Sequence, residues 1–547
     1  AVAGLVYLAL PVGYNALAGG SLAALVAYAA APWMLGQLAR ASSSGSFAGH
    51  SSLSSATLAL SLVTAIAAVF SPVAALVVGV LVAGLVVGSL VAGNLRGMGR
   101  TVLAGSIAVA LAAALHLPWA VALVAEGGQW APLGASGSTE PGTTSLVELL
   151  RFDTGPMAAT VLVWGLFVAG AYPLILGRGW RLVWAIRAWF VALAGWGLAW
   201  AAQWGALPVP LPSTELALVV AGVGLAMAVG VGAAVFEVDL LRHRFGWRQL
   251  LVVLAGAGLV CGIFPAFGAA FDGRWSMPRG DYDDLFASLL VEPERDGAYR
   301  VLWIGADQVL PARGWPLDAT SSFALTDDGP PDNRAQLVAP LDADTRRVRD
   351  AVREAAAGRS NRMGRLLAPA GVRYVVVVER LAPAPFADDT IAVAETITDG
   401  LSEQLDLRRI EGVNQALLFY ENAAWIPSRS AVPASSTRVP DPADVAPVLT
   451  DQAAASRFRG EVEAGPEIHM ASSRSSRWRL TVDGEVAARG DGFGWENRFT
   501  PLNRGVAELV YRTPLSRRGA LLAQAFGWLV VLVLLVNRRR AHLRGLT

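Results

Sequence analysis

The sequence predicts a polytopic α-helical membrane protein with an extracytoplasmic α/β plus β-sandwich region and a C-terminal transmembrane helix. Of its 547 residues, 54% are hydrophobic and only 16% are charged, whereas an average soluble domain carries about 25% charged residues. Apolar runs recur through the first half, and about 20 such residues cross a hydrocarbon core as a helix. Charged residues and turn-forming prolines and glycines return over residues 272–518.

The composition also excludes several classes of function. The formal net charge is +1, so no global field attracts nucleic acid, and we expect no nucleic-acid partner. The single cysteine, Cys261, excludes an intrachain disulfide and a cysteine-based metal cluster. The five histidines are scattered, without the spacing of a zinc-binding helix. No cofactor is evident in this chain.

About nine membrane spans are predicted within residues 1–271. The stretch 54–92 is too long for one span, and Ser71 and Pro72 in its middle predict a turn between two helices. The stretches 1–12 and 21–39 are weaker candidates, the first being the tail of a cut helix. The clear candidates are 101–124, 157–177, 183–201, 214–236 and 250–271, and a final span is predicted at 519–536.

The distribution of arginines predicts the orientation of these spans. The tail 537–547 is strongly basic, so the positive-inside rule places it in the cytoplasm and residues 272–518 outside. Loops 94–100 and 240–249 are basic and fall on the inside, whereas the loop 203–214 lacks basic residues and falls on the outside. We therefore expect a multi-pass protein of the cell membrane. Arg187, near the inner end of its span, is interpreted as reaching to the interface.

Residues 272–427 are predicted to form an extracytoplasmic α/β domain. Valine-rich runs predict buried strands at 299–305 and 372–378. Between them, 342–370 reads as a helix that breaks near Gly358 and resumes. Two further strands joined by a short turn are predicted within 405–422.

A second outer domain is predicted after a linker. Residues 428–450 are rich in proline, serine and alanine, which is typical of a linker. Period-two alternation over 477–484, 492–500 and 507–514 predicts a β-sandwich-like domain covering 451–518. That domain leads directly into the final span.

Three carboxylates close to the outer surface are candidate catalytic residues. Asp281, Asp283 and Asp284 follow the span that ends near residue 271. An enzyme acting on a lipid-linked donor needs a base at the membrane surface, or acidic ligands for a cation that neutralises phosphate. The motif lacks the spacing of a defined calcium loop, and a solvated acidic turn is the alternative.

Three tryptophans of the outer region are candidate glycan-binding residues. Trp315, Trp478 and Trp495 could stack on sugar rings. The alternative is that they fill the cores of small domains, as tryptophan often does in a sandwich.

Several stretches together resemble a known group of proteins. They are YRVLWIGADQVLPARGWPLD, ATSSFALTDDGPPD, GRLLAPAGVRYVVV, LDLRRIEGVNQALLFYENAAWIP and FGWENRFTPLNRGVAELVYRTPLSR. In this order they resemble the C-terminal membrane half of large actinobacterial polytopic family-2 glycosyltransferases. Similar sequence stretches occur in the outer domains of YfhO-like and lipid-linked-sugar transferase membrane proteins.

The resemblance implies a role in cell-envelope polysaccharide or glycolipid assembly. A membrane lipid and a polyprenyl-linked sugar or glycan would be the partners. The chain opens in hydrophobic sequence without a methionine, so we expect a fragment whose catalytic domain, with any divalent cation, lies upstream. Asp281 and Asp283 match the Asp-x-Asp motif with which that family binds a sugar nucleotide through a metal. The arginine distribution places them outside the cell, where nucleotide sugars are not supplied, so we do not assign them that metal-binding role. The alternative is a non-enzymatic lipid-glycan transporter, a flippase or an envelope scaffold.

Overall fold

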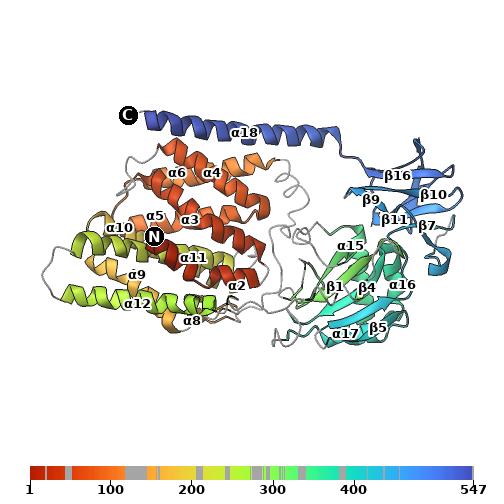
Figure 1. The fold of residues 1–547 in the computed structure, drawn as a ribbon, viewed down its shortest axis with the longest axis horizontal. Coiled ribbons are helices and arrows are strands. Elements are labelled where there is room, and N and C mark those ends of the chain that lie inside the picture. Colours follow the sequence, from red (N-terminus) through yellow and green to blue (C-terminus); the bar gives the residue numbers. More distant parts are fainter. Residues whose placement is uncertain are drawn as a thin grey trace. The chain divides into compact units, whose positions relative to one another are not determined.

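The computed structural model divides into two compact units (Figure 1). It describes residues 1–18, 21–43, 52–117, 144–155, 161–204, 214–240, 247–271, 296–306, 314–318, 320–329, 341–380, 390–414, 417–434, 438–454 and 456–544, with a few single residues between these ranges. The first unit holds the helices that precede residue 278 and most of the last helix. The second holds every strand that is described.

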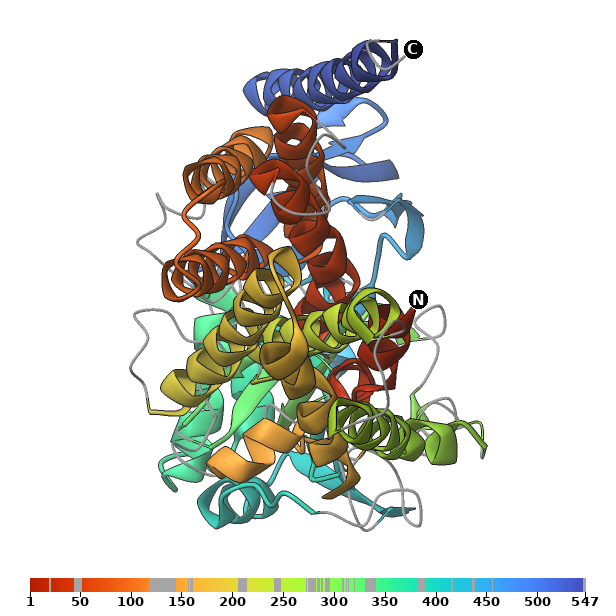
Figure 2. The ribbon, with the colours of Figure 1, turned by 90° about the vertical axis from the view of Figure 1, so that its left-hand side faces the viewer.

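The first unit is a set of packed apolar helices (Figure 2). They are α1 (Val2–Ala9), α2 (Val12–Ala18), α3 (Leu22–Ser42), α4 (Leu53–Phe70), α5 (Ala74–Val91), α6 (Met98–Leu115), α8 (Leu146–Arg151), α9 (Trp164–Leu176), α10 (Trp180–Gln203), α11 (Thr214–Val235), α12 (Trp247–Phe271) and α18 (Leu515–Arg544). Eight described helices, α3 to α6, α10 to α12 and α18, are long and apolar enough to cross a membrane. This arrangement fits a polytopic α-helical membrane protein with a β-rich region.

The division of the 54–92 stretch is confirmed. Helix α4 ends at Phe70 and α5 begins at Ala74, with Ser71 in extended conformation between them. The predicted span 157–177 is shorter among the described residues, where a 3₁₀ turn (Val161–Val163) leads into the 13-residue α9.

Glycines set how closely the membrane helices approach one another. A Cβ added to Gly84 or Gly88 of α5 would lie 2.7 Å or 2.6 Å from a Cα of α10. Gly165 of α9 and Gly258 of α12 each face the other's backbone in the same way. Small residues at these positions let the helix backbones pack together without a side chain between them.

The second unit contains an α/β sheet of six strands. They are β1 (Arg300–Gly305), β2 (Trp315–Pro316), β3 (Ser322–Asp327), β4 (Val372–Val378), β5 (Leu407–Asn414) and β6 (Leu417–Asn422), in the order β2-β3-β1-β4-β6-β5. Strands β1 and β4 are parallel, and the other pairs are antiparallel. The strands predicted at 299–305, 372–378 and within 405–422 are confirmed.

Helices cover one face of this sheet. They are α15 (Ala343–Ala356), α16 (Met363–Leu367) with the 3₁₀ turn η6 (Ala368–Ala370), and α17 (Glu395–Ser402). Leu302 and Val375 pack under these helices, while Trp303 and Val376 enter a second core on the opposite face. Successive strand residues point to opposite faces, so all seven residues of β4 are buried. The helix break predicted near Gly358 is confirmed, since Gly358 has φ +65° after α15.

A β-sandwich completes the second unit. One sheet has the order β13-β12-β16-β10-β9 and the other β14-β15-β11-β7-β8. The strands are β7 (Arg429–Val432), β8 (Ala446–Pro447), β9 (Asp451–Ala454), β10 (Arg457–Val462), β11 (Glu467–Ser473), β12 (Trp478–Val482), β13 (Glu485–Val486), β14 (Ala488–Gly492), β15 (Glu496–Thr500) and β16 (Gly505–Tyr511). Both sheets contribute to one core, which includes Phe458, Ile468, Leu480 and Leu509.

Two stretches of the segment predicted as a linker are strands. Residues 429–432 form β7, which pairs with β11, and residues 446–447 form β8 beside it. The side chains of β7 alternate between half-buried and fully buried. Serine and proline therefore occur here within a packed sheet, and the sheet begins before residue 451.

Candidate functional site

The acidic motif lies outside the described residues. Asp281, Asp283 and Asp284 belong to that part of the chain, so their catalytic role stays a prediction.

The three candidate tryptophans are half-buried in the second unit. Trp315 lies 5.4 Å from the ring of Phe323, and Trp478 lies 5.1 Å from the ring of Tyr511. Trp495, in the turn before β15, packs against the core beneath α15 to α17. These contacts account for their burial, and glycan stacking stays a prediction for all three.

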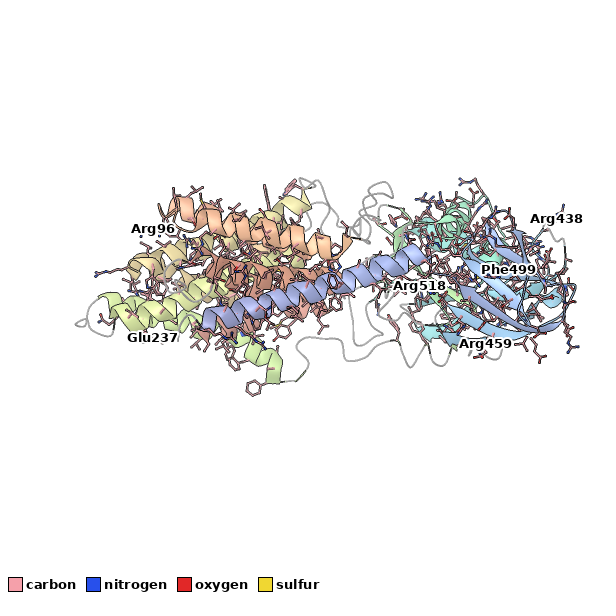
Figure 3. The ribbon with its side chains drawn as sticks, turned by 90° about the horizontal axis from the view of Figure 1, so that it is seen from above. Arg96, Glu237, Arg438, Arg459, Phe499 and Arg518 are labelled. Carbon is pink, nitrogen blue, oxygen red and sulfur yellow. The ribbon has the colours of Figure 1, made fainter. Side chains whose placement is uncertain are left out.

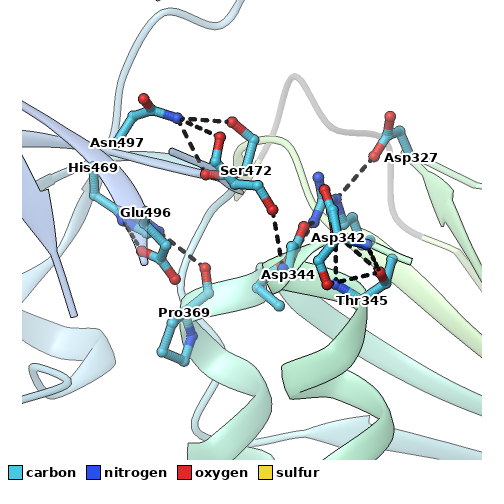
Figure 4. Close-up of polar contacts among 12 residues, drawn as sticks. Asp327, Asp342, Asp344, Thr345, Pro369, His469, Ser472, Glu496 and Asn497 are labelled. Atoms are coloured by element: carbon cyan, nitrogen blue, oxygen red, sulfur yellow. Dashed lines mark hydrogen bonds and ion pairs between the residues drawn. The ribbon is translucent and has the colours of Figure 1, made fainter. Parts of the chain in front are cut away.

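A group of ionisable side chains, most of them buried, lies where the sandwich meets the α/β domain (Figure 4). It consists of Arg300, Asp344, His469, Glu496 and Arg498, hereafter the polar junction. The first two come from β1 and α15, and the other three from β11 and β15. His469, Glu496 and Arg498 lie on the face of their sheet that is turned away from the sandwich core, and the α/β domain covers that face.

His469 and Glu496 form a close, fully buried pair. Nε2 of His469 lies 3.1 Å from the carbonyl oxygen of Pro369, which only accepts, so Nε2 carries a proton. Nδ1 lies 2.8 Å from Oε2 of Glu496.

Burial decides the protonation of Glu496. Both side chains of the pair are 0% exposed. Loss of hydration raises the pKa of Glu496 to about 7, while His469 and Arg498 favour the carboxylate and Asp344 opposes it. This carboxyl group therefore changes from its neutral to its charged form within the physiological pH range.

Arg300 binds two carboxylates beside this pair. It donates to Asp327 at 3.0 Å and also to Asp344, whose backbone N–H binds Oγ of Ser473 in the sandwich at 3.0 Å. Burial raises the pKa of Asp344, against the opposing effect of Arg300. Burial by itself lowers the pKa of Arg300, but Asp344 and Asp327 raise it above its usual value.

Two contacts at the polar junction join the domains, from His469 to the carbonyl of Pro369 and from the N–H of Asp344 to Oγ of Ser473. Within the sandwich, Asn497 of β15 donates three bonds of 3.1 Å from its side-chain amide to Ser472 and Ser473 of β11. Because His469 and Glu496 have no exposed surface, a substrate does not reach either side chain in this structure. What the pair can do chemically is couple the docking of the sandwich on the α/β domain to pH.

Sequence reasoning missed this group for a physical reason. His469 and Glu496 occupy strand positions that alternate with core residues such as Ile468. That pattern is the same for a face in water and for a face covered by another domain. Only the covering domain distinguishes the two.

Two buried polar side chains of the first unit, Arg187 and His116, bind backbone carbonyls of neighbouring segments. Arg187 donates to the backbone carbonyls of Asn94 and Arg96, beyond the C-terminal end of α5, where the helix dipole favours a cation. Ring nitrogens of His116 contact the carbonyl of Ala65 at 2.9 Å and the amide of Gln524 at 3.4 Å. Among the described residues of this unit, Arg187 is the one buried side chain with a permanent charge.

Among the residues that the structure describes, no set of three or more histidine, cysteine, aspartate or glutamate side chains could hold a metal ion.

Two solved structures show similarity to this chain. A cryo-EM structure of the arabinofuranosyltransferase AftD from Mycobacteria has a TM-score of 0.40 and 15% identity, over 94% of this chain and 48% of that chain. A mutant form of AftD has a TM-score of 0.41 and 15% identity, over 93% and 50%. The chain thus spans about half the length of these proteins, and TM-scores this low do not establish a shared fold. No protein-family model and no curated protein sequence matches.

Proposed function

We propose that this chain is the membrane region of a glycosyltransferase that assembles cell-envelope polysaccharide or glycolipid from a lipid-linked sugar. The observation that carries the proposal is the joining of eight membrane-length apolar helices to a β-rich unit with a sandwich. Sandwich architectures recur among lectins, which bind carbohydrate. The sequence resemblance described above supports the same substrate class.

The first unit argues against an ion-coupled transporter. Proton relays need aspartate, glutamate or histidine chains within the membrane. Among the described residues of the helices, buried formal charge is confined to Arg187, whose guanidinium binds backbone carbonyls. A non-enzymatic lipid-glycan transporter or scaffold remains the alternative function, and the experiment below separates it from an enzyme.

The experiment uses the intact protein that contains this chain. Purified protein in liposomes is given a radiolabelled polyprenyl-linked sugar and a glycan acceptor, and we expect labelled product. Replacing Asp281, Asp283 and Asp284 with asparagine should lower the rate about 100-fold or more, the usual contribution of a general acid or base.

Asp350→Asn is the matched control, because Asp350 is an exposed carboxylate on α15 that pairs with its neighbour Arg349. An unchanged rate in the triple variant would remove the three aspartates from the site. Movement of the labelled lipid across the bilayer without any transfer would favour the transporter alternative.

A further inference from the structure

One end of the sandwich carries an arginine group next to the start of α18. Arg479 of β12 and Arg457 of β10 lie on either side of Val510 of β16, directly opposite it in the two ladders. Adjacent strands are about 4.8 Å apart, and opposed residues point to the same face. Leu509 is buried in the core, so Val510 and its two arginine neighbours face outward.

The next positions extend this group. The N–H of Arg512 donates to the carbonyl of Arg477 at 2.8 Å, so the ladder continues past the end of β16. Residues two apart in a strand point to the same face. Arg477, two residues before Arg479, and Arg512, two residues after Val510, therefore lie on this face as well. Both side chains are exposed. These four residues, Arg457, Arg477, Arg479 and Arg512, are hereafter the arginine face.

Little negative charge balances the arginine face. Glu508 pairs with Arg457 at 2.9 Å and also with Arg459. Arg477 donates to the hydroxyl of Tyr511 at 3.2 Å. Among the residues that the structure describes, no carboxylate pairs with Arg477, Arg479 or Arg512.

Some other exposed arginines of this unit have a carboxylate partner. Arg359, Arg474 and Arg504 form ion pairs of 2.7 Å, 2.9 Å and 3.3 Å with Glu354, Asp491 and Glu463.

The chain connects this end directly to an apolar helix. Strand β16 ends at Tyr511 and α18 begins at Leu515. Arg517 and Arg518 lie in the first turn of α18, and Figure 3 labels Arg518 at that position. Three extended residues and one helical turn reach at most about 17 Å, so Arg512 lies within that distance of the apolar run that starts near residue 519.

We propose that the arginine face, with Arg517 and Arg518, binds the phosphate groups of anionic lipid headgroups on the leaflet that α18 enters. Guanidinium groups bind phosphate through paired charge-assisted hydrogen bonds. The headgroup layer is where the first turn of a membrane-spanning α18 lies. The inference rests on the membrane placement proposed above, but it does not depend on glycosyl transfer.

Lipid binding is measured on the full chain in nanodiscs, in a Cys261→Ser background. A donor dye is attached at Ser456→Cys, an exposed position next to Arg457, and acceptor dyes are carried on lipid headgroups. We expect higher energy transfer with phosphatidylglycerol present than in pure phosphatidylcholine, and a loss of the difference at high salt.

The triple variant Arg477→Gln, Arg479→Gln and Arg512→Gln should abolish this lipid dependence. Each basic residue near an anionic surface changes partitioning about fivefold, so three together amount to roughly 100-fold. The corresponding triple lysine variant keeps the charge and should retain most of the effect, which separates charge from misfolding.

Arg504→Gln is the matched control, because Arg504 is exposed and precedes the other end of β16. It should leave the lipid dependence unchanged. Equal energy transfer in both lipids, or an unaltered response in the glutamine triple variant, would overturn the proposal. A fall caused by inorganic phosphate, beyond that caused by chloride at equal ionic strength, would overturn it in favour of a discrete phosphate site.

Discussion

His469 links two domains of the second unit, because its Nε2 donates to the carbonyl of Pro369 in the α/β domain while its Nδ1 contacts Glu496 in its own sandwich. Burial raises the pKa of Glu496 to about 7. The folded protein therefore holds a proton on this carboxyl group that the unfolded chain releases near its ordinary pKa.

The sign of the resulting pH dependence follows from proton binding. Between the ordinary pKa of glutamate, about 4.3, and about 7, the folded state binds more protons at Glu496 than the unfolded state. Its contribution to the free energy of unfolding therefore falls as pH rises through this window, by up to about 1.4 kcal/mol per pH unit. The contribution is constant above the window.

The variant Glu496→Gln removes this titration while keeping the shape of the side chain. We expect the apparent Tm of wild type, minus that of the variant, to be larger at pH 5 than at pH 8. Tryptophan fluorescence of the full chain in detergent measures both. Glu461→Gln, at an exposed position of β10, is the control, and a Tm difference independent of pH would contradict the raised pKa of Glu496.

At the scale of elements, helix α5 shows how the membrane helices pack. Gly84 and Gly88, four residues apart, share one side of the helix and meet α10 at Val191 and Arg187. Gly79 of the same helix has nothing within 4 Å of an added Cβ. Close helix packing therefore requires glycine at residues 84 and 88 but not at residue 79, and the difference lies in the neighbouring helix.

The variants Gly88→Ala and Gly79→Ala test this difference directly. A Cβ at residue 88 would lie 2.6 Å from the Cα of Arg187, so the helices must separate, at a cost of about 1–3 kcal/mol. At residue 79 alanine meets no atom and should be neutral or stabilising by up to about 1 kcal/mol. Thermal unfolding in detergent should show a lower Tm for the first variant only, and equal Tm values would argue against close packing of α5 on α10.

At the scale of the whole molecule, the main prediction concerns which side of the membrane the β-rich unit and the C-terminus face. The arginine-rich end of α18 predicts a cytoplasmic C-terminus and an extracytoplasmic β-rich unit. The arginine face would then meet the outer leaflet, and any lipid-linked sugar handled there would be presented outside.

Cysteine labelling on intact cells tests the orientation. In the Cys261→Ser background, a membrane-impermeant maleimide should label Arg489→Cys, an exposed position of β14, and should not label Arg540→Cys near the end of α18. Both positions should react after permeabilisation. Labelling of residue 540 alone on intact cells would reverse the predicted topology.

Much of the local structure was predictable from the sequence. The turn at Ser71 and Pro72, the buried strand 372–378 and the helix break at Gly358 were all expected, and the structure has them. Each depends on backbone limits or on a period of two or 3.6 residues within one segment. The catalytic aspartates and glycan-binding tryptophans remain predictions.

The sequence by itself determined which segments are apolar enough to form membrane-length helices and which alternate as strands, because hydrophobic periodicity is a local property. Only the tertiary structure decided that His469 faces Pro369, 100 residues away, and that Gly88 contacts Arg187. It also placed Arg457, Arg479 and Arg512 on one face of a sheet. These pairings depend on which surfaces pack against one another. The sequence around each residue gives no information about a partner that is distant in the chain.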